Sequence, residues 1–449
     1  MSKQKIQLSD HFDYSRLLQF VLPCVGTMLF TSIYGIVDGL CVSNFVGKTA
    51  FAAVNLIMPV PMLVGSVGFM LGTGGSAIVG ITLGEGDQKK ADRYFTLFLL
   101  AALVSVSVLA VLGIVFLRPI AVLLGAKGEL LDYAVRYGRI LMVSLPTFAL
   151  QNMFQSFFVT AEKPHLGFWF TVGAGCTNMV LDVLMVGIWG WGVEGAAIAT
   201  FISQLVGGVL PVFYFIDRSN SSRLHLCKTS FYSKVLRDAC INGSSELMTN
   251  LSMSLVNILY NYQLLRLAGE NGVAAYGVIM YAAFLFVAVF VGYAVGSAPI
   301  VSFHYGARNH AEVHNLYRKS LRLIAVVAVT LTLASMFIIP CVARIFVGYD
   351  AELLALTSRA FRLYALSFLI MGFNVYASSF FTALGDGVTS ALISFLRTLA
   401  FQVIAILLLP LLLGIDGIWL AVTAAELAAL AVSAAMLLTK DKVFHYRKA

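Results

Sequence analysis

Long runs of apolar residues recur along the whole chain and are separated by short polar segments. Twelve of these runs reach about 20 residues or more, the length an α-helix needs to cross a hydrocarbon layer of about 30 Å. A membrane β-barrel would instead show short segments of alternating polarity. The pattern therefore predicts twelve membrane-spanning helices. Their expected ranges are 15–40, 50–83, 94–117, 133–160, 166–188, 193–216, 235–262, 272–305, 316–339, 361–384, 388–412 and 417–438.

The distribution of basic residues predicts which way the helices run. An even number of crossings places both termini on one side of the membrane. Of the 30 Lys and Arg residues, 20 lie in segments on the side of the termini and 9 lie on the opposite side, while Arg397 lies inside a helix. Because loops on the cytoplasmic side carry the excess of Lys and Arg, both termini are predicted to be cytoplasmic.

The two halves of the chain repeat each other at an offset of 222 or 223 residues. Residues 77–87 (AIVGITLGEGD) align with 299–309 (PIVSFHYGARN), and residues 155–164 (QSFFVTAEKP) align with 378–387 (SSFFTALGDG). Polar loop residues keep this register as well as the apolar ones. Such a period indicates that one structural unit occurs twice.

Six helices per repeat is an even number, so the two halves have the same orientation in the membrane. They are then related by an axis along the membrane normal, as in some secondary transporters. We predict an all-α integral membrane protein built from two parallel-repeat six-helix bundles. Its parts are an N-terminal lobe (1–216), a cytoplasmic linker (217–234) and a C-terminal lobe (235–449).

Composition narrows the class of protein further. The chain is 59% hydrophobic and 12% charged, whereas soluble domains are about 25% charged. The net charge of +8 is explained mainly by the excess of Lys and Arg in the segments on the side of the termini. It is therefore a signal of topology, and nucleic-acid binding is not expected. The sequence has no GxxxxGK[ST] phosphate loop and its cysteines show no CxxC spacing. We therefore expect no enzyme activity, cofactor or metal, and we expect an ion gradient as the energy source.

Ionisable residues at membrane depth are functional candidates by default. Asp38 and Asp182 lie within about two helical turns of the outer ends of their helices, and Asn178 shares a helix face with Asp182. Thr200 is expected at the same level on the next helix. Carboxylate, amide and hydroxyl oxygens suit a hard cation such as Na⁺, and two adjacent carboxylates can instead carry a proton. The alternative is that the aspartates only face the interface or join helices.

The C-terminal half contributes three further ionisable residues. Glu246 lies about three turns into its helix and is a possible second cation or substrate site, or a side chain wetted by a cytoplasmic cavity. Arg397 and Glu426 lie at similar depth on adjacent antiparallel helices. We interpret them as a structural ion pair, with a role in cation coupling as the alternative.

The stretch AEKPHLGFWFTVGAGCTNMVLDVLMVGIWGWGVEGAAIATFISQ (161–204) resembles the bacterial MATE (multidrug and toxic compound extrusion) family, especially its DinF-like branch. The segments VDGLCVSNFVG (37–47) and YGARN (305–309) resemble the same family. The likeness extends over nearly the whole chain and implies a V-shaped pair of six-helix bundles.

By this resemblance the family's N-lobe cation site corresponds to Asp38, Asn178, Asp182 and Thr200. The range 361–384 lacks the carboxylate of NorM-like members, so no C-lobe cation site carries over to that helix, although Glu246 is available.

These observations predict a Na⁺- or H⁺-coupled antiporter in the bacterial cytoplasmic membrane. It would export amphipathic, often cationic drugs or toxic metabolites by alternating access, as a monomer in the lipid bilayer. The alternative is a flippase for a lipid-linked precursor, which a central cavity lined with Arg or Lys would favour. A passive channel would show no dependence on a gradient.

Overall fold

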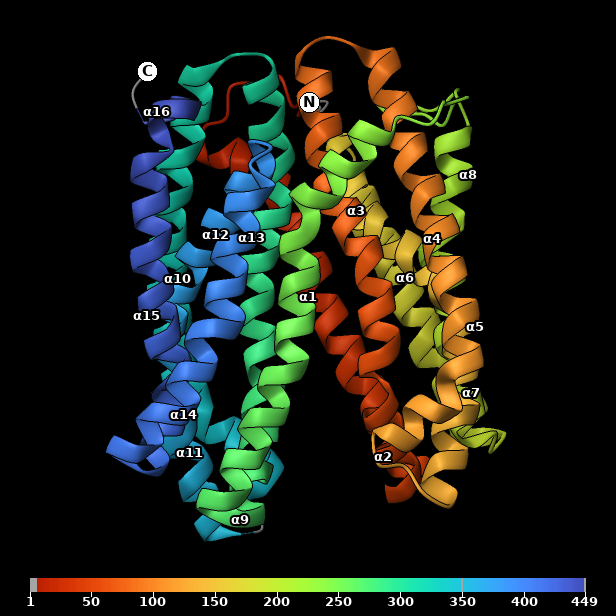
Figure 1. Cartoon of the computed structure of the whole chain (residues 1–449), viewed down its shortest axis with the longest axis vertical. Coiled ribbons are helices and arrows are strands. Elements are labelled where there is room, and N and C mark those ends of the chain that lie inside the picture. Colours follow the sequence, from red (N-terminus) through yellow and green to blue (C-terminus); the bar gives the residue numbers. More distant parts are fainter. Residues whose placement is uncertain (1–5, 349, 448–449) are drawn as a thin grey trace.

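The computed structural model describes residues 6–348 and 350–447, which form helices joined by short turns and no strand (Figure 1). In chain order the elements are α1 (Tyr14–Phe45), α2 (Lys48–Ile57), α3 (Pro59–Gly84), α4 (Gln88–Leu123), α5 (Glu129–Thr160), α6 (Pro164–Asp182), η1 (Val183–Ile188), α7 (Gly192–Gly208), α8 (Leu210–Ile216), α9 (Ser233–Gly306), α10 (His310–Val347), α11 (Ala351–Ala365), α12 (Phe368–Ala383), α13 (Gly387–Phe395), η2 (Leu396–Ala400), α14 (Phe401–Leu413), α15 (Ile415–Thr439) and α16 (Asp441–Phe444).

The number of membrane crossings follows from these helices. Nine described helices are long and apolar enough to span a membrane, and the pair α11 and α12, bent by 46°, makes ten. As one straight rod the 74-residue α9 would be about 110 Å long, but it reverses direction at Gly269, where φ is 61° and ψ is −150° (Figure 1). It therefore crosses twice. The 32-residue α5 supplies another crossing, which gives the twelve predicted from the apolar runs.

The predicted range 50–83 is not one continuous helix. It breaks at Met58 into α2 and α3, and Pro59 occupies the first turn of α3. Proline has no backbone N–H and is tolerated at that position. Inside a longer helix its ring would clash with the backbone carbonyl four residues earlier, so the helix tends to break before it. The excess length of the apolar run is therefore taken up by a separate short helix.

The two halves of the chain form two helical bundles, the N-lobe (α1–α8) and the C-lobe (α9–α16), with residues 217–232 between them. We call the side at which both termini lie the terminal side and the opposite side the distal side (Figure 1). One hydrophobic core includes Phe98 of the N-lobe and Phe380 of the C-lobe. Two others are each confined to one lobe, around Tyr137 and around Trp419. The lobes therefore share a core towards the terminal side and have separate cores towards the distal side.

Small residues let helices of the two lobes approach closely. A Cβ on Gly80 of α3 would lie 2.8 Å from the Cβ of Ser302 in α9, its counterpart at an offset of 222. A Cβ on Gly292 of α9 would lie 2.5 Å from the Cα of Val25 in α1. Ordinary contacts of this kind are 3.4 Å or longer. Close backbone approach at small residues is a main source of packing energy between membrane helices.

The segment before α1 ties the two lobes together on the terminal side. The Leu8 amide donates to Glu162 Oε1 at 2.9 Å, and Glu162 lies in the turn between α5 and α6 of the N-lobe. The Phe12 amide donates to Glu312 Oε1 of α10 at 2.9 Å, and Lys319 Nζ donates to the Phe12 carbonyl at 2.7 Å. Separation of the lobes at this side must break either the bond to Glu162 or the bonds to Glu312 and Lys319, unless the segment itself extends.

Left-handed residues occupy matching turns in the two repeats. Gly86 (φ 86°) corresponds to Arg308 (φ 55°), and Gly385 (φ 82°) corresponds to Glu162 (φ 62°). A residue with a Cβ in this conformation costs roughly 1–2 kcal/mol. The turns are therefore built for glycine, and in each pair one copy departs from it.

Candidate functional site

Asp38 and Asp182 meet within the N-lobe at the same depth. Asp38 lies seven residues before the distal end of α1, and Asp182 ends α6. Their carboxyl groups face each other closely enough to interact electrostatically. Asp182 is fully buried. The π-helical segment η1 starts at the next residue, and such segments occur frequently at functional sites.

The cluster contains several buried polar atoms that lack a hydrogen-bond partner among the described residues. They are Asp38 Oδ1, both carboxylate oxygens of Asp182, both ends of the Asn178 amide and the Tyr137 hydroxyl. A buried group without a partner costs about 1–3 kcal/mol. Two facing carboxylates have no hydrogen to share unless one is protonated. The arrangement is therefore suited to a small cation or a shared proton.

Thr200 was predicted from the sequence to belong to this cluster, whereas two nearby tyrosines, Tyr34 and Tyr137, were not. Thr200 lies on α7, which packs against α6, but the hydrogen bond described for its hydroxyl goes to the Ala196 carbonyl at 3.0 Å. Tyr34 and Tyr137 were not predicted, and both lie within electrostatic reach of Asp38. Tyr34 precedes Asp38 by four residues and so shares its helix face. Tyr137 lies on α5, far from both aspartates in the sequence, so no spacing along the chain predicts its position beside them.

A second polar cluster lies in the C-lobe. Arg397 Nε in η2 is 3.7 Å from Glu426 Oε1 in α15. Asn374 Nδ2 in α12 donates to Glu426 Oε2 at 2.7 Å, and Ser433 Oγ donates to Asn374 Oδ1 at 2.9 Å. Glu426 is therefore held by neutral partners as well as by Arg397.

Glu246 belongs to this second cluster. It lies on the first arm of α9 and is within electrostatic reach of Arg397. Glu246 and Arg397 line a cavity of about 100 Å³ between the lobes, which we call the interlobe cavity. Arg397 and Glu426 line a second cavity of about 170 Å³ inside the C-lobe, which we call the C-lobe cavity. Arg397 thus stands at the junction of the two.

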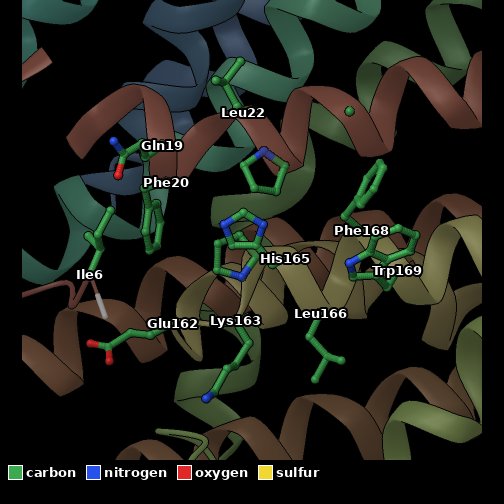
Figure 2. Close-up of a pocket in the computed structure, with 13 residues that line it drawn as sticks. Ile6, Gln19, Phe20, Leu22, Glu162, Lys163, His165, Leu166, Phe168 and Trp169 are labelled. Carbon is green, nitrogen blue, oxygen red and sulfur yellow. The ribbon is translucent and has the colours of Figure 1, made fainter. Parts of the chain in front are cut away.

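A larger cavity than these two lies elsewhere, beside the turn between α5 and α6 of the N-lobe (Figure 2). It has a volume of about 900 Å³ and runs between α1 and the start of α6. Figure 2 shows Leu22 on one wall and His165 and Trp169 on the other. Leu22 and Trp169 are 56% and 64% exposed, so the groove opens on the outer surface of the lobe. None of the residues predicted as functional lines it.

No three His, Cys, Asp or Glu side chains gather as a metal site would require, within the part of the chain that the structure describes.

Comparison with known proteins identifies the family. The MatE family model matches residues 23–184 and 247–408, one match in each lobe, and the second match starts 224 residues after the first. The multidrug export protein MepA of Staphylococcus saprophyticus is 21% identical over 436 residues, covering 96% of this chain and 95% of that protein.

Solved structures show the same fold. The chain is similar to a crystal structure described as MATE in complex with MaL6, with a TM-score of 0.92 and 23% identity over 100% of both chains. It is also similar to a structure described as the outward-facing conformation of a multidrug resistance MATE family transporter, with a TM-score of 0.91, 23% identity and 100% coverage of both chains. The two-lobed helical fold is thus confirmed, whereas assignment to the DinF-like branch stays a prediction. Because the family model covers more than two thirds of the residues and matches both lobes, this protein belongs to the MatE family, whose members are transporters and not enzymes.

Proposed function

We propose that the protein is a monomeric, cation-coupled antiporter that exports amphipathic, often cationic small molecules across the bacterial cytoplasmic membrane. The name of the MepA relatives, multidrug export protein, supports the substrate class. The excess of basic residues on the terminal side supports a cytoplasmic location for that side.

The unpartnered oxygens around Asp38 and Asp182 carry the proposal. Two carboxylates held together in a medium of low dielectric repel each other strongly. A Na⁺ ion or a shared proton removes the repulsion and fills the oxygen shell. Since both residues lie towards the distal side, the coupling cation enters from outside the cell.

The position of Asp38 on α1 explains how binding reaches the substrate path. The same helix contacts Gly292 of the C-lobe through Val25, and the segment before it binds Glu312. A cation that draws Asp38 and Asp182 together changes the position of α1. It therefore changes the relative stability of the states that are closed on the terminal side and on the distal side, which is the requirement for coupling.

The cavities do not favour the flippase alternative. Arg397 is the one Lys or Arg among the residues that line the interlobe and C-lobe cavities, and Glu246 and Glu426 face it. A phosphate-bearing lipid precursor would need an excess of positive charge.

Dye efflux from proteoliposomes, driven separately by Na⁺ and H⁺ gradients, tests the proposal. Asp38→Asn and Asp182→Asn keep the size of each side chain and remove the ionisable oxygen, so each is expected to nearly abolish efflux. Asn178→Ala and Thr200→Ala each remove one neutral oxygen and should weaken efflux less. The gradient that drives the wild-type protein identifies the coupling ion.

The control is Asp132→Asn, the same change at an exposed position on the distal side of the N-lobe. It should leave efflux unchanged when activity is normalised to reconstituted protein. Near-normal efflux in either Asp38→Asn or Asp182→Asn would contradict the N-lobe site and direct attention to Glu246.

A further inference from the structure

The guanidinium of Arg397 is mostly buried, and one of its nitrogens has no hydrogen-bond partner among the described residues. Its side chain is 14% exposed, and Nη1 is buried without a partner among the described residues. The 3.7 Å between Nε and Glu426 Oε1 exceeds a hydrogen-bond distance. An arginine side chain offers five N–H donors. A charged donor left unsatisfied in a protein interior is costly, so an acceptor that reaches Nη1 would be stabilising.

Glu426 is a poor candidate for that partner. Paired arginine and carboxylate groups frequently form two short, parallel hydrogen bonds. Glu426 Oε2 instead accepts a hydrogen bond from Asn374, which also donates to the Glu426 backbone carbonyl at 2.9 Å. Ser433 holds Asn374 in turn. The carboxylate is thus fixed at a distance, and the planar edge of Arg397 is left for an acceptor in the adjoining cavities.

The surroundings of Arg397 define the chemistry of such an acceptor. A carboxylate matches the planar fork of a guanidinium. A simple anion would also be repelled by Glu246 and Glu426, which face the same arginine. A molecule that carries a positive charge as well as a carboxylate avoids this repulsion, because its cationic part can lie near Glu246 in the interlobe cavity.

Aromatic side chains complete the C-lobe cavity. Tyr260 and Tyr276 stack with ring centroids 4.9 Å apart, and Tyr364 and Phe284 also line the space. The volume of about 170 Å³ is similar to that of an engineered cavity of about 150 Å³ that binds one benzene. Offset or edge contacts with these rings favour an aromatic group. The cavity therefore has room for one aromatic ring beside Arg397.

We propose that the C-lobe cavity binds an aromatic carboxylate that belongs to a zwitterionic, amphipathic substrate. The carboxylate pairs with Arg397, its ring packs against Tyr260, Tyr276 and Tyr364, and the cationic part of the molecule lies near Glu246. The site rests on the proposed export function and adds a substrate class to it, since cation transport alone does not require a buried arginine.

Two fluorescent dyes that differ only in this group test the site. Rhodamine 110 carries a free benzoate on a cationic ring system, and rhodamine 123 is its methyl ester. Fluorescence anisotropy with the purified full-length protein at pH 7.5 gives a Kd for each dye. We expect the wild-type protein to bind the acid at least fivefold more tightly than the ester.

Arg397→Gln should shift the two affinities in opposite directions. The acid loses its partner and should bind at least tenfold more weakly. The ester should bind as well as before or more tightly, because a like charge is removed while both carboxylates are kept. Arg397→Lys keeps the charge without the fork and should give an intermediate loss for the acid.

Matched variants separate recognition from folding. Arg362→Gln makes the same change at an exposed position of α11 and should alter neither affinity. If Arg397→Gln does not fold because Glu426 is left unpaired, the double variant Arg397→Gln/Glu426→Gln, in which both members of the pair are neutral, carries the same comparison.

Equal affinity for both dyes, or an equal loss for both on removal of Arg397, would overturn the site. Binding of the ester without the acid would also refute it, while leaving the export of cationic compounds intact. Failure to bind either dye would contradict the site and the proposed substrate class together.

Discussion

The contact between α1 and α9 offers a direct test of how the terminal side is held closed. A Cβ on Gly292 would lie 2.5 Å from Val25 Cα, 2.9 Å from Val25 N and 3.0 Å from Cys24 O. All three are backbone atoms, so no change of rotamer relieves the overlap. Ordinary contact begins at 3.4 Å, and the difference of 0.9 Å must come from a displacement of α1 relative to α9.

The energetic effect of Gly292→Ala follows from this displacement. Overpacking of this kind typically costs about 1–3 kcal/mol. The better helix propensity of alanine does not offset this cost, because α9 stays helical whether the lobes are together or apart. The closed arrangement should therefore lose about 1–3 kcal/mol relative to arrangements in which the lobes part on this side, which corresponds to a change of about 5–150-fold in the equilibrium between them.

Thiol modification of a cysteine buried in the contact measures that equilibrium. Ser302 is fully buried opposite Gly80, and Ser302→Cys in a variant without the six native cysteines reports opening in inside-out vesicles. Gly292→Ala should raise its modification rate by about 5–150-fold, following the equilibrium. Gly277→Ala, in the same helix with no atom within 4 Å of the added Cβ, is the control. Equal rates for the two alanine variants would refute the proposed role of the contact.

Three other predictions concern topology, the N-lobe site and a surface ion pair. Cysteines at Lys89 or Arg223 should resist impermeant thiol reagents in intact cells, and ready labelling would reverse the predicted orientation. Tyr137→Phe removes an unpartnered hydroxyl beside the aspartates and should lower efflux severalfold at an unchanged protein level; unchanged efflux would separate this hydroxyl from the site. Burial opposes ionisation of Asp386, but bonds such as that from Lys440 Nζ at 2.8 Å outweigh it and lower the pKa of this carboxyl. Its stabilising effect is then fully present above the unfolded-state pKa of about 3.9 and is lost as the pH falls through the lower pKa of the folded state. Asp386→Asn should therefore lower the Tm at pH 7, and the difference in Tm from the wild-type protein should shrink steadily as the pH is lowered below about 4.

The sequence predicts the helices of this protein well because lipid imposes a simple rule. Every backbone polar group must be satisfied within the segment that crosses the membrane, so each long apolar run becomes a helix. The exception has a local cause, because the run over 50–83 contains Pro59 and divides there. The run over 133–160 follows the rule and forms α5, although Gln151, Asn152 and Gln155 reduce its apolar character.

The candidate sites were predictable only in part, because depth and helix face can be read from a sequence but neighbours cannot. Asp38 and Asp182 share a depth, and the structure places them face to face. Tyr137 joins them through the packing of α5, which no spacing along the chain encodes. Arg397 and Glu426 were expected as a pair, but the bonds from Asn374 that leave the arginine largely unsatisfied depend on a third helix.

The unequal terminal-side turns described above bear on the history of the chain. Two copies of one ancestral segment would both begin with glycine at positions that require a left-handed backbone. In this chain each pair has glycine in one copy, at Gly86 and Gly385, and a residue with a Cβ in the other. At Glu162 the replacement accepts the Leu8 amide and pairs with Arg223, neither of which has a counterpart at Gly385. Duplication alone gives a symmetric molecule, in which either half could serve as the first. A glutamate rather than a glycine at position 162 gives the amino-terminal segment one place to bind, and so makes the two halves of the repeat distinct.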